Sequence, residues 1–129
     1  MREREDAFLD RAEESLAGAE SEFVNSRYNN CANRCYYACF QAAIAALSNA
    51  GIQPPGRDGQ WGHDSVQAQF IGLLVNRRQL YPTSLRPTLE QTYRLRATAD
   101  YKEDPVSEIR AARAMRRAEE FLAAIRQRG

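Results

Sequence analysis

The sequence contains one histidine and one tryptophan in 129 residues, and it has no long hydrophobic run. No apolar stretch approaches the roughly 20 residues that a membrane-spanning helix requires. The first ten residues, MREREDAFLD, are charged from the second position and lack the apolar segment of a signal peptide. We therefore expect a cytoplasmic protein that keeps its thiols reduced and has no membrane partner.

The chain also lacks the glycine motifs of phosphate-binding loops and any strong excess of charge. Its glycine-rich stretch, GRDGQWG, does not lie between a predicted strand and a predicted helix, as a nucleotide-binding loop would. The formal net charge is +1, but residues 1–22 carry eight acidic and three basic side chains, whereas residues 76–102 carry six basic and two acidic. This asymmetry predicts either a surface that faces phosphate or a partner protein, or a basic helix that pairs with an acidic neighbour.

Apolar residues recur at helical spacing through most of the chain, and no segment alternates as a half-buried strand does. The predicted helices are residues 5–23, a long helix ending near Ala50, a third beginning near Asp64 or Ser65, a fourth over 85–99, and a last one capped by Ser107. Asn25 or Ser26 is expected to cap the long helix, and Gly51 to end it. The segments GIQPPGRDGQWG, YPTS and DYKEDP are predicted breaks.

These features predict one all-α domain over residues 1–129, folded as a four- to five-helix up-and-down bundle. A chain of this length can bury a core without disulfides or metal ions.

Three cysteines, at positions 31, 35 and 39, lie along one stripe of the predicted long helix. Side chains four residues apart have Cβ atoms about 5–6 Å apart, whereas a disulfide needs about 3.8 Å. Cys31 and Cys39 are separated by about 12 Å along the helix axis, so the three thiols cannot bind one metal ion. His63 is the only histidine. We interpret the cysteines as small buried core residues and expect neither a metal nor another cofactor.

Large polar and aromatic residues occupy the other faces of the same helix, among them Arg34, Tyr36, Tyr37 and Phe40. A guanidinium or a phenol inside a bundle needs hydrogen-bonding partners. One interpretation is that Arg34 pairs with a carboxylate of the acidic first helix while the tyrosines pack between helices. The other is a polar cleft between the helices.

The stretch NRCYYACFQAA, residues 33–43, resembles a helix of the HEPN domain family. The stretches HDSVQAQF, RLRATADY and AEEFLAAI follow in the family's order, so the resemblance covers nearly the whole chain. It implies a four- to five-helix bundle that forms a homodimer and acts beside a minimal nucleotidyltransferase. Many members of the family are metal-independent ribonucleases of toxin–antitoxin or defence systems.

The sequence departs from the family's ribonuclease motif, an arginine followed after four to six residues by histidine and often by x-Tyr. Aligning Tyr101 with the motif tyrosine places Arg94 at the arginine but Ala99 at the histidine, as in a subgroup without the histidine. Arg57 and His63 have the required spacing by number, but they precede the third helix. We interpret His63 as a residue that caps or packs at the start of that helix.

The resemblance and the charges together define the candidate residues. Those expected to bind nucleotide or RNA are Arg34, Tyr36, Tyr37, Arg94 and Arg96. Candidate catalytic residues are Arg94, Arg96 and Asp100, and the candidate modification site is Tyr101, the position that matches a tyrosine adenylylated by the partner transferase. We expect a protein that binds RNA or nucleotide phosphate and acts with that partner. The alternatives are a metal-independent ribonuclease with a variant Arg/Asp/Tyr site and a non-catalytic helical adaptor, so enzymatic activity stays open.

Overall fold

Helices account for all the regular secondary structure in the part of the chain that the structure describes. The structure is a computed structural model, which describes residues 3–56, 59–101 and 105–128, and only the backbone of residues 3–6 and 101. Its five α-helices are α1 (Glu3–Val24), α2 (Tyr28–Asn49), α3 (His63–Gln69), α4 (Thr88–Tyr101) and α5 (Glu108–Arg128). A π-helical segment, η1 (Phe70–Arg77), continues α3, and a short 3-10 turn, η2 (Thr83–Leu85), precedes α4. The predicted all-α class is confirmed.

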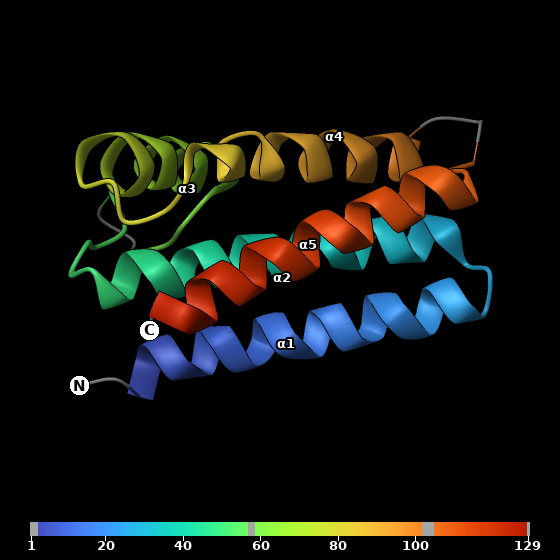
Figure 1. The fold of residues 1–129 in the computed structure, drawn as a ribbon, viewed down its shortest axis with the longest axis horizontal. Helices are drawn as coiled ribbons and strands as arrows, with labels where there is room; N and C mark the ends of the chain where they lie inside the picture. The colour runs from blue at the N-terminus through green and yellow to red at the C-terminus, as the bar shows by residue number, and fades with distance from the viewer. Residues whose placement is uncertain (1–2, 57–58, 102–104, 129) are drawn as a thin grey trace.

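The four long helices alternate in direction along the bundle (Figure 1). Helix α1 lies along one side, α3 and α4 lie along the other, and α2 and α5 run between them. Helix α2 contacts α1, α4 and α5, so it is the central helix. This is the predicted up-and-down arrangement. None of the described helices is both long enough and apolar enough to span a membrane.

The central helix is built largely from small residues. Cys31, Cys35 and Cys39 are fully buried, together with alanines on the same side of α2. Small side chains allow neighbouring helices to pack closely around α2. Burial raises the pKa of the Cys39 thiol to about 12, so this cysteine stays protonated at neutral pH. The interpretation of the three cysteines as core residues is confirmed.

Larger apolar side chains fill the core at the end of the bundle where η1 meets α5. The ring of Phe70 lies 5.1 Å from that of Phe121 and 5.4 Å from that of Tyr81, measured between centroids. Phe70 and Phe121 are fully buried. Aromatic contacts of this kind stabilise a core beyond the effect of the buried area alone. They attach the segment after the glycine-rich loop to the C-terminal helix.

The predicted N-cap of α2 is wrong. The residue before α2 is Arg27, which makes no side-chain capping hydrogen bond. The Asn25 side chain instead donates to the carbonyl of Ser21 at 2.8 Å, which satisfies an acceptor at the end of α1, and Ser26 has a positive φ of 61°. At the other end, Gly51 has a φ of 81°, as expected for a glycine that ends a helix.

Helix α4 extends further toward the C-terminus than predicted. Asp100 and Tyr101 were expected in the break after residue 99, but both belong to α4. The Asp100 carboxylate lies 3.6 Å from Nε of Arg96, one helical turn earlier, and such pairs favour the helix. The predicted cap of the last helix is confirmed, because the backbone N–H of Arg110 donates a hydrogen bond to Ser107 Oγ at 3.2 Å.

The described ion pairs test whether the acidic first helix pairs with the basic segment of residues 76–102. Helix α1 packs against α2 and α5, and its Glu13 forms an ion pair with Arg126 of α5. Among the side chains that the structure describes, no ion pair joins α1 to residues 76–102. For the described side chains, the explanation of the uneven charge by pairing of these two segments is therefore wrong.

Candidate functional site

A polar pocket of about 720 Å³ opens between α1, α2 and α4. Nearly all the residues that line the pocket have polar side chains, and most belong to α2. Helix α2 contributes Asn29, Asn30, Asn33, Arg34, Tyr37 and Gln41, α1 contributes Ser15, and α4 contributes Ala99 and Asp100. The lining residues of α2 recur every three or four positions, so they form one stripe beside the buried cysteine stripe. The pocket has the size of a small-molecule site, but its polar lining favours a charged or hydrogen-bonding ligand. The structure thus has the polar cleft of the second interpretation, whereas Tyr36 packs between helices as in the first.

Arg34 is an exposed cation in this pocket. No hydrogen bond or ion pair joins its guanidinium to another residue of the described set, so the expected pairing with a carboxylate of the first helix is wrong for those residues. The end of its side chain, from Cδ to Nη1, lies against Gly18 of α1. Asn33, one residue earlier, likewise has no hydrogen-bond partner among the described residues. Both side chains therefore retain donors for a ligand.

Arg96 supplies a second positive charge beside the pocket. Its guanidinium carbon lies 5.4 Å from the ring centroid of Tyr37 and 5.6 Å from that of Tyr36, both on α2. Its Nε lies 3.6 Å from the Asp100 carboxylate, and this buried nitrogen has no hydrogen-bond partner in the described structure. A buried donor without a partner is costly unless a ligand or water satisfies it. Arg96 thus connects the aromatic residues of α2 with the acidic side of the pocket.

Arg94 lies on a different face of α4 from Arg96. Residues two apart in a helix point in nearly opposite directions. Its Nε donates to Glu90 Oε2 at 2.7 Å, and its side chain is 78% exposed. The hydrogen bond from Arg94 holds the pKa of Glu90 below its usual range, so Glu90 is a carboxylate at neutral pH. The structure therefore brings together Arg34, Tyr37, Arg96 and Asp100, and it places Arg94 outside the pocket.

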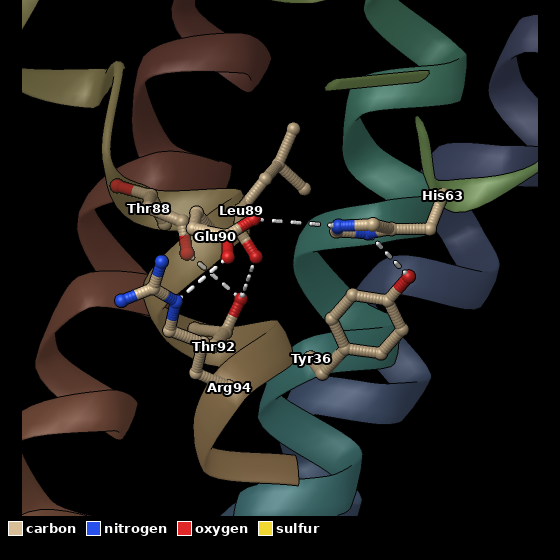
Figure 2. A network of polar contacts seen from close by, with 7 residues as sticks. All are labelled: Tyr36, His63, Thr88, Leu89, Glu90, Thr92 and Arg94. Atoms are coloured by element: carbon tan, nitrogen blue, oxygen red, sulfur yellow. Dashed lines mark hydrogen bonds and ion pairs between the residues drawn. The ribbon is translucent and has the colours of Figure 1, made fainter. Parts of the chain in front are cut away.

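His63 is the centre of a polar network that joins α2, α3 and α4 (Figure 2). Its Nδ1 lies 3.0 Å from the Tyr36 hydroxyl, and its Nε2 lies 3.7 Å from Oε1 of Glu90. The imidazole also stacks on Tyr93, with 3.8 Å between ring centroids. In the neutral ring, a proton on Nε2 faces the Glu90 carboxylate and leaves Nδ1 to accept the hydrogen bond that the Tyr36 hydroxyl donates. The interpretation of His63 as a residue packed at the start of the third helix is confirmed.

This network holds Tyr36 in place but gives it no acid–base role. Burial raises the pKa of the Tyr36 hydroxyl, an effect that the charge of Arg96 partly opposes. The hydroxyl is therefore protonated at neutral pH and cannot act as a general base. Tyr36 is 4% exposed, so it supports the pocket from behind while Tyr37 faces it. Sequence reasoning missed the network because Tyr36 and His63 are 27 residues apart.

Two candidate residues lie outside the described side chains. Arg57 belongs to residues 57–58, which the structure does not describe, so the position of Arg57 relative to His63 lies outside the described structure. Tyr101 is the last residue of α4, but its side chain is not among those described. Its backbone position follows Asp100, which lines the pocket.

Two comparisons with known proteins cover nearly the whole chain. A family model of the HEPN domain matches residues 6–128. A protein of Methanocaldococcus jannaschii named "putative toxin" is 31% identical to this chain over 127 residues, which are 98% of this chain and 90% of that protein. Both similarities span the three helices that line the pocket and the helix that carries His63.

Proposed function

The chain belongs to the HEPN domain family, and from this membership we propose that it is a toxin-like protein whose pocket binds a phosphate group of RNA or of a nucleotide. The observation that carries the proposal is that Arg34 lines a polar pocket and that Arg96 lies beside it, against the ring of Tyr37, which also lines the pocket. Arg34 has no partner among the described residues, and Nε of Arg96 is buried without a hydrogen bond. Guanidinium groups bind phosphate oxygens through several directed hydrogen bonds.

The other groups in the pocket suit a nucleotide better than a simple anion. The side-chain amides that line it offer both donors and acceptors, which match the edges of a base. Tyr37 is 37% exposed and provides an aromatic surface at the pocket. Unpaired bases commonly stack on such rings in proteins that bind single-stranded nucleic acid. These features favour single-stranded RNA or a mononucleotide as the ligand.

A metal-independent ribonuclease is the second candidate function. The Asp100 carboxylate lies 3.6 Å from Arg96 Nε, which places a possible base beside a cation that could stabilise a developing phosphate charge. The single histidine, His63, is held by Tyr36, Glu90 and Tyr93 and does not line the pocket. The pocket thus has a carboxylate but no imidazole for proton transfer. For that reason we place phosphate binding before cleavage.

Incubation of the purified protein with single-stranded RNA in EDTA distinguishes the candidates. We expect the RNA to be bound and to stay intact, because the pocket has cations but only a carboxylate as a base. Cleavage that persists in EDTA and is lost in Asp100→Asn would instead identify a ribonuclease. If the protein neither binds nor cleaves the RNA, both candidate functions are contradicted and a helical adaptor remains.

The proposed partner is a minimal nucleotidyltransferase that modifies Tyr101, and the protein itself is proposed to be a homodimer. Tyr101 is the last residue of α4 and directly follows Asp100, which lines the pocket. Co-expression with such a transferase is expected to add the mass of one or more AMP units, and Tyr101→Phe is expected to prevent it. Unmodified wild-type protein after co-expression with an active transferase would contradict this partner.

A further inference from the structure

Helix α1 has a glycine in its interior that its backbone does not require. Gly18 lies far from both ends of the helix, which spans Glu3–Val24. The glycines with positive φ are elsewhere, at positions 51, 56 and 59 among the described residues. A glycine with ordinary helical dihedral angles destabilises a helix relative to alanine, because it loses more backbone freedom on folding. Its presence therefore calls for a reason outside the backbone.

The side chain of Arg34 fills the space that a side chain at position 18 would occupy. A Cβ atom built on Gly18 would lie 2.8 Å from Cδ of Arg34, 3.0 Å from Nη1 and 3.4 Å from Cζ. These are the three nearest atoms, and none belongs to the backbone of α2. The glycine thus serves the arginine side chain and not a close approach of the two helix backbones, which run side by side in Figure 1.

The rest of the Arg34 environment does not fix the guanidinium. It has no hydrogen bond or ion pair to another described residue, and it lines the pocket together with Asn33 and Tyr37. A long side chain without such partners samples many rotamers in water, and ordering it on binding costs entropy. The missing side chain at Gly18 leaves a notch in the facing helix, and this notch restricts the end of the Arg34 side chain, from Cδ to Nη1, before any ligand arrives.

We propose that Gly18 is a positioning residue, which makes room on α1 so that Arg34 lies across the helix and presents its guanidinium to a phosphate group in the pocket. The inference rests on the proposed phosphate-binding function and adds a residue to it. The methyl group of alanine at position 18 displaces Arg34 from the notch, whereas the helix itself tolerates alanine better than glycine. Binding and stability consequently respond in opposite directions.

The chain supplies a matched control in Gly72, which lies within η1. A Cβ built on Gly72 meets no atom within 4 Å, so Gly72→Ala makes the same chemical change in a helical segment without a contact. Arg34→Ala and the double variant Gly18→Ala with Arg34→Ala complete a thermodynamic cycle. The probes are a short fluorescein-labelled single-stranded RNA and, in separate titrations, AMP.

Gly18→Ala is expected to weaken RNA binding by about 3- to 10-fold, because it displaces one charge-assisted contact without removing it. It is expected to keep or raise the melting temperature, by up to about 4 °C. Gly72→Ala should bind as the wild type does, and Gly18→Ala should have no further effect once Arg34 is alanine. Weakening with RNA alone assigns the phosphate to an RNA backbone, and weakening with AMP as well assigns it to a terminal nucleotide phosphate.

Different outcomes separate this inference from the function on which it rests. Wild-type affinity in Gly18→Ala, with weak binding in Arg34→Ala, would overturn the role of Gly18 and leave the phosphate site in place. A fall in melting temperature together with affinity, or a loss that persists in the Arg34→Ala background, would also overturn it. Unchanged binding in Arg34→Ala would contradict the proposed function itself.

Discussion

Arg34→Ala is expected to weaken binding of single-stranded RNA by about 10- to 100-fold, the loss that follows removal of a charge-assisted contact of about 1.5–3 kcal/mol. Arg34 lines the pocket and has no partner among the described residues that would compete with a phosphate. The fold should be unaffected, because the side chain is exposed. Fluorescence anisotropy at fixed salt measures the affinity, and circular dichroism measures the helix content.

Arg94→Ala is the matched control for this experiment. Both substitutions remove one positive charge, so they lower the general attraction for RNA by similar amounts. Arg94, however, is 78% exposed and pairs with Glu90 outside the pocket. We expect its substitution to change the affinity by no more than about 2- to 3-fold, as for a distant surface charge. Equal losses of affinity in the two variants would mean that RNA binding depends only on the protein's positive charge and that the pocket is not the binding site.

His63→Phe is expected to lower the free energy of unfolding by about 1–3 kcal/mol, the cost of leaving a buried hydroxyl without its partner. The Tyr36 hydroxyl bonds to Nδ1 of His63 at 3.0 Å, and Tyr36 is 4% exposed. Phenylalanine keeps a ring that can stack on Tyr93, so the variant removes mainly the polar contact. Urea denaturation followed by circular dichroism measures the change.

The variant Tyr36→Phe completes a cycle with His63→Phe. Alone, it removes the same hydrogen bond and is expected to cost about 0.5–1.5 kcal/mol. In the double variant neither polar group remains buried, so the cost should be smaller than the sum of the two single costs. Additive costs would contradict a direct Tyr36–His63 interaction and would place His63 in some other structural role.

The fold could be predicted from the sequence because local signals and tertiary packing agree. Small residues along residues 27–50 indicated a buried central helix, and the structure places α2 at the centre of the bundle. Helix ends were less predictable. Asn25 is a favoured N-cap residue, yet it serves the end of the preceding helix, and Asp100 continues α4 through its contact with Arg96. Such choices depend on neighbours that a propensity argument does not include.

The candidate site could be predicted only in part. Arg34, Tyr37, Arg96 and Asp100 were singled out from charge, residue type and resemblance, and they meet at or beside one pocket. Their separation from Arg94 follows from helical geometry, since residues 94 and 96 point in nearly opposite directions.

The His63 network and the notch at Gly18 could not be predicted from the sequence. Each depends on contacts between residues distant in the chain, Tyr36 with His63 and Gly18 with Arg34. A weak signal existed in each case. His63 is the only histidine, and Gly18 is the only glycine within the helix Glu3–Val24.

The location of bound RNA tests the central claim most directly, and nitrogen-15 NMR of the side chains can determine it. Titration with single-stranded RNA is predicted to shift the side-chain amide of Asn33 and the Nε–H resonances of Arg34 and Arg96, which lie at or beside the pocket. Arg94 should change little. Shifts confined to the arginine side chains of α5, with the pocket resonances unchanged, would contradict the account and place RNA on the C-terminal helix instead.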